Sequence, residues 1–216
     1  MKVRENKSRE VKEKIVDIAR HLFITQGYQQ TTTRQIIEAA GINNSTLYHF
    51  FRDKEDLFQS IVFDVYIKSI QIINQTKHKE DDGVFLYALD RVVEFKAVAK
   101  YRNVAQTFLD VYSSWRISEK VTKADIERCK LFFKSFTKNF SQEDYYVRNL
   151  ALRGMRLNFI AECVHMGGGK FEQRWPFLIK KDLQFFNVPK ADIQKTIERI
   201  ATVINEKSFA IFGLTI

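Results

Sequence analysis

Hydrogen-bonding side chains suited to nucleic-acid recognition are concentrated between residues 32 and 54. Asn, Ser and Thr can hydrogen-bond to base edges, whereas Tyr, His and Lys can reach backbone phosphates. Thr32 and Gln35 have the T-x-x-Q spacing of a capping box, which predicts a helix start, and Asn43 can cap a second helix just after Gly41. Two short helices joined by a three- or four-residue turn with glycine have helix-turn-helix geometry, which points the start of the second helix at the DNA major groove.

Residues with catalytic or metal-binding chemistry form no comparable pattern. The four histidines, at positions 21, 49, 78 and 165, are scattered, with no H-x-x-x-H pair and no acidic partner at ligand spacing. Gly169-Lys170 lacks the flanking residues of a phosphate-binding loop, and no G-x-S-x-G motif occurs. We therefore expect no catalytic residue, no metal, no cofactor and no enzymatic activity.

The composition indicates a helical protein. Only 8 Gly and 2 Pro occur in 216 residues, too few for the many turns of a β or doubly wound α/β fold. The 35 Lys+Arg exceed the 26 Asp+Glu, and this net charge of +9 suits a polyanionic partner without proving one. No stretch approaches the roughly 20 apolar residues of a spanning helix. With no visible signal peptide and two distant cysteines, we expect a cytoplasmic protein without a membrane partner.

Helical periodicity predicts two parts, a DNA-binding domain at 1–54 and a larger body at 55–216. The expected fold class is all-α, with an N-terminal three-helix helix-turn-helix domain followed by a helical ligand-binding and dimerisation domain. The expected helices are one ending at Gly27, then about 33–40, about 44–50, one beginning after Asp53, 84–115 with a break near 100–103, 119–139, 143–166, 173–186 and 190–212.

The stretch GYQQTTTRQIIEAAGINNSTLYHFFRDKEDLF, residues 27–58, resembles the DNA-binding module of TetR-family bacterial transcriptional regulators. With the helix before it, the resemblance covers about residues 10–60. It implies an all-helical homodimer with a divergent ligand-binding body, usually a repressor released by a small molecule. The matching features are Gly27-Tyr28, Thr32, Ile36, Ala40-Gly41, the run from Thr46 to Phe51, and Lys54 to Leu57.

The resemblance also implies roles for individual residues. Phosphate contacts are assigned to Thr32, Tyr48, His49 and Lys54. Base-reading or base-proximal positions are Arg34, Asn43, Asn44, Ser45 and Thr46. Thr33 completes the predicted DNA-binding set. Asn44 and Ser45 depart from the lysine and glycine frequent there, which leaves the operator sequence open.

Simpler structural roles stay open for some of these residues. Thr32 can act as a helix cap alone, and Tyr48 can pack on its neighbours. The Lys/Arg-rich start is interleaved with Glu5, Glu10 and Glu13, so it fits a solvated helix end better than an arm on DNA.

The helix expected at 143–166 has two apolar stripes, so it must be covered on two sides. One stripe is a heptad seam, and the C-terminal helix offers a matching row of isoleucines. We expect a two-fold dimer built from four helices, two from each chain. The predicted interface residues are Leu150, Gly154, Leu157, Ala161, Ile197, Ile200 and Ile204.

Aromatic residues are abundant in the central helices, where a single aromatic is more often core than pocket. Nineteen Phe in one helical chain nevertheless suggest an apolar, aromatic or multi-ring ligand. Polar residues that could orient it are Gln106, Asp110, Asn158 and Glu162. The candidate ligand-binding residues are Phe63, Tyr66, Phe108, Tyr112, Trp115, Phe133 and Phe159.

The expected function is a ligand-responsive, sequence-specific transcriptional regulator. In its simplest form it is a repressor that binds a palindromic double-stranded DNA operator as a homodimer and is released by an apolar or aromatic small-molecule effector. Two alternatives remain open: a sequence-indifferent DNA-binding protein, and a helical lipid-binding protein or enzyme with a relict helix-turn-helix. Residues 1–54 hold 10 Lys+Arg against 6 Asp+Glu, so the spacing of polar residues supports DNA binding better than bulk charge does.

Overall fold

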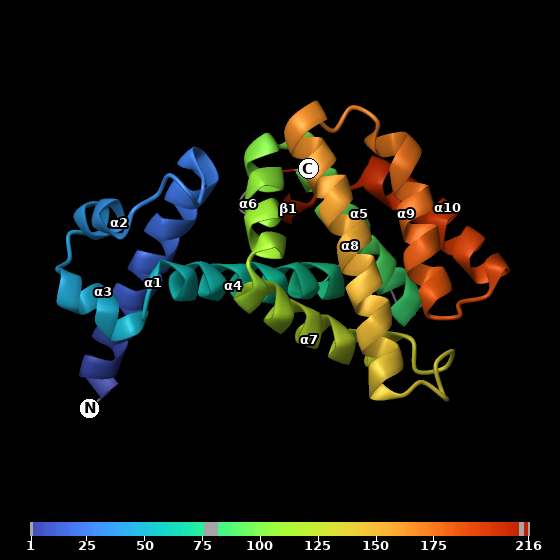
Figure 1. Ribbon diagram of the computed structural model, residues 1–216, viewed down its shortest axis with the longest axis horizontal. Helices are drawn as coiled ribbons and strands as arrows, with labels where there is room; N and C mark the ends of the chain where they lie inside the picture. Colours follow the sequence, from blue (N-terminus) through green and yellow to red (C-terminus); the bar gives the residue numbers. More distant parts are fainter. Residues whose placement is uncertain (1, 76–81, 212–213, 216) are drawn as a thin grey trace. The chain divides into compact units, whose positions relative to one another are not determined.

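The computed structural model describes residues 2–75, 82–211 and 214–215, and helices dominate it (Figure 1). The chain divides into two compact units, Met1–Tyr66 and Ile67–Ile216. The sequence placed the boundary at residue 54, but the first turns of α4 (Lys54–Gln75) belong to the first unit. Leu57 and Phe58 on α4 explain the later boundary, because both are buried in the core of that unit.

The first unit is a small helical module around one apolar core. Its helices are α1 (Lys2–Gln26), α2 (Thr33–Ala40), α3 (Asn44–Phe50) and the start of α4. Phe23 of α1 packs edge-on against Phe58 of α4, with ring centroids 5.2 Å apart. Arg20 of α1 and Asp64 of α4 form an ion pair at 2.7 Å beside that contact. The start of α4 is therefore fastened to α1 by both apolar and charged groups.

Local capping signals determine where α2 and α3 begin and end. The predicted capping box is present, since Gln35 N–H donates to Thr32 Oγ1 and Thr32 N–H donates to the Gln35 side chain. Gly41 ends α2 with φ of 62°, a left-handed conformation that glycine adopts without strain. Asn43 caps α3 as predicted, with its side chain accepting from Thr46 N–H. The turn between the helices is thus specified by its own residues.

The second unit is arranged around α5, which is buried along most of its length. The helices are α5 (Gly83–Lys100), α6 (Arg102–Ser113), α7 (Trp115–Phe132), α8 (Gln142–Met166), α9 (Phe171–Phe185) and α10 (Lys190–Glu206). α5 contacts each of the other five helices, and it lies behind α8 and α9 in Figure 1. The predicted break near 100–103 is confirmed at Tyr101, between α5 and α6.

The C-terminal end of the second unit corrects one sequence expectation. The helix predicted over 190–212 ends at Glu206, and two short antiparallel strands follow, β1 (Ala210–Ile211) and β2 (Leu214–Thr215). The Tyr101 hydroxyl donates to the Thr215 carbonyl at 2.7 Å, so tertiary contact with the α5–α6 junction competes with helical periodicity here. Apart from this pair of strands, the described chain has the predicted all-α fold.

Candidate nucleic-acid interface

The helix α3 presents a row of polar side chains to solvent. Asn44, Ser45, Tyr48 and His49 are exposed. Tyr48 is the largest of these side chains, and 52% of its surface is exposed. Leu47 lies on the opposite side and is buried in the core of the unit. Because Leu47 anchors the helix from beneath, the exposed side chains form one continuous polar surface.

Asn43 also orients the first hydroxyls of α3. Its Oδ1 accepts from Thr46 N–H at 2.8 Å, from Thr46 Oγ1 at 2.8 Å and from Ser45 Oγ at 2.7 Å. The hydroxyl hydrogens of Ser45 and Thr46 are therefore directed at the cap, which leaves their oxygen lone pairs as acceptors for an outside donor. In the DNA major groove such donors are the amino groups of adenine and cytosine.

The candidate residues of α2 flank this surface. Thr32 and Arg34 are exposed, whereas Thr33 is half-buried. Arg34 Nε lies 2.9 Å from Glu38 Oε1, and that hydrogen bond raises the pKa of Arg34. Both partners are on the surface, where such a pair contributes little to stability. Arg34 can consequently exchange Glu38 for another anion at little cost.

Lys54 has a structural role that its sequence position did not reveal. Its Nζ donates to the carbonyls of Tyr28 at 2.9 Å and Thr31 at 3.0 Å, and it lies 4.2 Å from the centroid of the Tyr28 ring. The ammonium thereby ties the start of α4 to the loop that precedes the Thr32 cap. The phosphate contact of Lys54 stays a prediction beside this observed role.

Lys54→Met is expected to lower the free energy of unfolding by about 1.5–3 kcal/mol, because it removes the charged donor of two backbone carbonyls. Urea unfolding followed by circular dichroism measures the change. Lys14→Met on the exposed side of α1 is the matched control and should stay within about 0.5 kcal/mol of the original. Equal stability losses in the two variants would contradict a stabilising role for the hydrogen bonds from Lys54 to the Tyr28 and Thr31 carbonyls.

The candidate ligand-binding residues differ in their exposure and surroundings. Phe133 stacks on Phe186 at 4.4 Å between ring centroids and belongs to the core. Trp115 is 63% exposed at the start of α7. Tyr112 is buried, Phe63 and Phe108 are half-buried, and the side chain of Tyr66 lies outside the described residues.

Phe159 is the candidate that reaches a hollow, a groove of about 450 Å³ between α8 and α9. Asn158 and Glu162, expected to orient a ligand, line the same groove. Glu162 forms an ion pair across it with Arg174 at 2.7 Å. The remaining lining residues are Met155, Gln173, Phe177 and Leu178. The groove is therefore mainly apolar with polar groups near one end.

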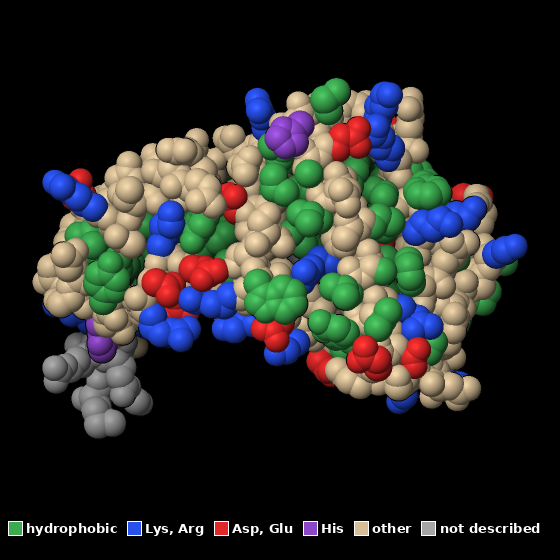
Figure 2. Space-filling view, in the orientation of Figure 1, with side chains coloured by type: hydrophobic (Ala, Val, Ile, Leu, Met, Phe, Trp, Pro, Cys, Tyr) green, Lys and Arg blue, Asp and Glu red, His purple; other side chains and the backbone are tan. Residues whose placement is uncertain are grey.

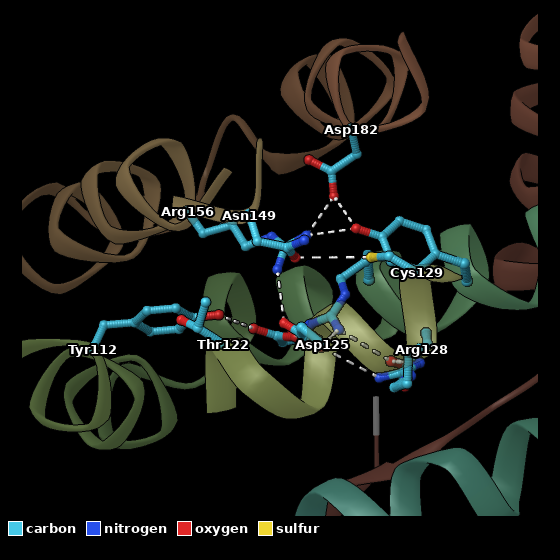
Figure 3. A network of polar contacts seen from close by, with 12 residues as sticks. Tyr112, Thr122, Asp125, Arg128, Cys129, Asn149, Arg156 and Asp182 are labelled. Atoms are coloured by element: carbon cyan, nitrogen blue, oxygen red, sulfur yellow. Dashed lines mark hydrogen bonds and ion pairs between the residues drawn. The ribbon is translucent and has the colours of Figure 1, made fainter. Parts of the chain in front are cut away.

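The interior of the second unit holds a buried charge network that the sequence analysis missed (Figure 3). We define it as the connected charged residues and one tyrosine of α5, α7, α8 and α9, namely Tyr87, Asp90, Arg91, Glu94, Asp125, Arg128, Arg156 and Asp182. A signal was present, since charged residues 90, 91 and 94 interrupt the otherwise apolar segment 83–95. Their partners Asp125 and Arg128 lie on another helix, so the sequence alone could not pair them.

Two arginines hold the buried charge network together. Arg91 bridges Glu94 at 2.8 Å and Asp125 at 2.6 Å, and Arg156 bridges Asp125 at 3.3 Å and Asp182 at 2.8 Å. Three arginines and four carboxylates thus lie together in this part of the interior. Burial raises the pKa of Glu94, and the neighbouring Arg91 opposes the rise.

The predicted dimer residues separate into two groups. On α8, Leu150 is exposed, and Gly154, Leu157 and Ala161 are half-buried. On α10, Ile197 is half-buried, but Ile200 and Ile204 are 0% and 3% exposed. The assignment of Ile200 and Ile204 to an interface is wrong, because α10 packs this row against its own subunit, in contact with α5 and α9.

The apolar surface beside α8 comes from α9 instead. Phe177 and Phe185 of α9 are exposed at 57% and 37%. Figure 2 shows hydrophobic side chains gathered over α8 and α9, with charged groups around them. The exposed apolar residues of this surface are Tyr146, Val147, Leu150, Phe177 and Phe185. We call this set the α8–α9 surface.

Two further searches of the described residues give negative results. No group of three His, Cys, Asp or Glu among them is arranged to hold a metal ion. Within the same part of the chain, no helix has the length and apolar character needed to cross a membrane.

Comparison with known proteins identifies the first unit. Residues 15–61 match the family described as bacterial regulatory proteins, tetR family. The chain is 40% identical over 52 residues to the HTH-type transcriptional regulator QacR of Staphylococcus aureus, covering 24% of this chain and 28% of QacR. It is 37% identical over 57 residues to AcrR of Shigella flexneri, covering 26% of each chain. The matches thus span about a quarter of these curated relatives.

Solved structures share the fold over most of the chain. RolR in complex with its ligand resorcinol is 18% identical with a TM-score of 0.65, covering 90% of this chain and 96% of RolR. TylP, a tetR regulator of Streptomyces fradiae, is 15% identical with a TM-score of 0.59, covering 92% and 97%. Residues 15–61 therefore match the tetR family of bacterial regulatory proteins, and the chain as a whole shares the helical fold of these solved structures.

Proposed function

We propose that the protein is a sequence-specific transcriptional repressor that binds a palindromic DNA operator as a homodimer and is released by a small molecule. The observation that carries the proposal is α3, anchored by Leu47 and presenting Ser45, Tyr48 and His49 on one exposed polar surface. A helix anchored in this way can enter the major groove without disturbing the core beneath it.

The roles of the α3 residues follow from their hydrogen bonds. Ser45 and Thr46 offer oxygen lone pairs, so they read adenine or cytosine amino groups. Tyr48 and His49 are exposed donors that reach the phosphates beside the bases, together with Thr32 at the start of α2. Arg34 joins the interface by exchanging Glu38 for a base or phosphate.

Selection from a pool of random DNA duplexes tests this function. We expect one enriched motif with two-fold symmetry, because two recognition helices about 34–36 Å apart, or a multiple of that spacing, read two half-sites. Thr46→Ala should relax the preference at particular base pairs at a cost of about 1–3 kcal/mol. Binding without any enriched motif would instead establish the sequence-indifferent alternative. No binding to any duplex would favour a lipid-binding protein or an enzyme.

The α8–α9 surface supports the dimer. Leu150 and Phe177 are large apolar side chains exposed on neighbouring helices, and Gly154 has open space above its backbone, where a helix from a second copy can approach. A two-fold axis through this surface would pair two helices from each subunit.

Leu150→Asp is expected to convert a dimer to a monomer, because it places a carboxylate in the centre of the apolar contact. Sedimentation at micromolar protein concentration measures the change. Leu131→Asp is the matched control, since Leu131 is more exposed but lies on α7, outside the α8–α9 surface. The interface would be wrong if the original protein were monomeric, or if both variants behaved alike.

We place the effector in the groove between α8 and α9. Its volume is within the range of ligand sites, and Phe159, Leu178 and Met155 favour an apolar or aromatic molecule. RolR, which shares the fold, is solved in complex with resorcinol, an aromatic molecule. The groove borders the α8–α9 surface, so a ligand there would alter how two subunits pack and thereby the spacing of their recognition helices.

A further inference from the structure

A second hollow lies in the first unit, between α1 and α3. Its volume is about 410 Å³, and it is lined by Lys7, Ser8 and Val11 from α1 and by Ser45, Thr46, His49 and Phe50 from α3. Figure 1 shows the N-terminal half of α1 beside α3. We call this hollow the α1–α3 groove. It adjoins the residues proposed to read bases but is formed in part by a helix that the proposed function does not use.

The groove has an apolar floor and a rim of hydrogen-bond donors. Val11 and Phe50 are half-buried, whereas Lys7, Ser8 and His49 are exposed. None of the seven lining residues is acidic. An ammonium, a hydroxyl and an imidazole around one hollow are complementary to an anion.

We propose that the α1–α3 groove binds a phosphate of the DNA strand beside the base pairs that α3 reads, with Lys7 supplying the charge and Ser8 and His49 donating hydrogen bonds. The inference rests on the proposed DNA-binding function. DNA is the occupant because the groove shares Ser45 and Thr46 with the base-reading surface, so a strand seated on α3 must pass beside it.

Lys7 differs in position from two neighbouring cations of α1, Arg9 and Lys12. Arg9 forms an exposed ion pair with Glu13 at 3.7 Å, and Lys12 lies 5.6 Å from the centroid of the Phe51 ring. Neither residue lines the groove. The Lys/Arg-rich start of the chain, which fits a solvated helix end by sequence, therefore contains one lysine placed at the interface.

The test measures operator affinity of the full-length protein by fluorescence anisotropy at several salt concentrations, with the duplex obtained by selection. For Lys7→Ala, we expect the slope of log K against log salt to shrink by about 1 per subunit, with the base preference unchanged. Raising salt from 50 to 200 mM would then cost the variant about three- to fourfold less affinity per subunit than it costs the original.

Arg9→Ala is the matched control, because it removes the same charge from the same helix outside the groove. It should leave the slope close to the original value. Lys7→Arg keeps the positive charge in the groove and should also keep the original slope. Ser8→Asp puts a carboxylate into the groove and should weaken binding more than Lys7→Ala does. Unfolding curves of each variant show whether the module remains folded.

Two outcomes would overturn the inference. Equal slope changes for Lys7→Ala and Arg9→Ala would show an effect of bulk charge alone, and unchanged affinity of Ser8→Asp would show that no phosphate enters the groove. Both outcomes are distinct from failure of the proposed function, in which the original protein would bind no duplex.

Discussion

Arg156→Met is expected to lower the free energy of unfolding of the second unit by about 3–5 kcal/mol. Arg156 is 2% exposed, and its guanidinium contacts Asp125, Asp182 and the Tyr87 hydroxyl. Methionine fills much of the same volume but leaves the two carboxylates buried without this cation. An uncompensated buried charge costs far more than the loss of an exposed ion pair.

Chemical unfolding followed by circular dichroism measures this loss. Lys123→Met is the matched control, because Lys123 pairs with Glu119 at 2.8 Å on the surface of the same unit, and we expect it to cost less than about 1 kcal/mol. Adding Asp182→Asn to Arg156→Met should recover part of the loss by removing one of the stranded carboxylates. If Arg156→Met and Lys123→Met were equally stable, Arg156 would not stabilise the second unit through the buried charge network.

Gly168→Ala is expected to destabilise the second unit by about 1–3 kcal/mol or more. A Cβ built on Gly168 would lie 2.0 Å from the Ala99 carbonyl oxygen and 2.4 Å from Ala99 Cα. These are backbone atoms of α5, the central helix, so neither can rotate aside as a flexible side chain would. The backbone after α8 or the end of α5 would have to shift.

Gly169→Ala provides the comparison, since a Cβ there meets nothing within 4 Å. Neither glycine has a positive φ, so neither substitution forces alanine into a left-handed conformation. The two substitutions differ in the space available to the added Cβ. Thermal unfolding should show a clearly lower Tm for Gly168→Ala and a nearly unchanged Tm for Gly169→Ala. Similar melting of both variants would contradict the close approach of the two backbone segments.

The elements that could be predicted from sequence are those specified by neighbouring residues. Thr32 with Gln35 and Asn43 with Thr46 act within one helical turn, so the limits of α2 and the start of α3 were readable. The same holds for the capping box of Ser141 at the start of α8. In the candidate interface, the identity and the exposure of the α3 residues could be predicted in the same way.

What could not be predicted depends on residues that are far apart in the chain. Arg156 and Asp182 are 26 positions apart, and Lys54 donates to carbonyls 23 and 26 positions away. Periodicity also shows that a helix has an apolar row without showing what covers it. For this reason Ile200 was assigned to a partner subunit, although α10 packs it inside its own subunit.

The buried charge network has a consequence for the alignment of the helices along their axes. Apolar side chains tolerate sliding, because one leucine can replace another as a neighbour. A shift of α9 by one helical turn, about 5.4 Å, would instead separate Asp182 from Arg156 and Tyr87 and leave the buried Asp182 carboxylate without these partners. The network thus admits a single longitudinal alignment of α5, α7, α8 and α9. Loops in the second unit can change in length while these helices keep the same register.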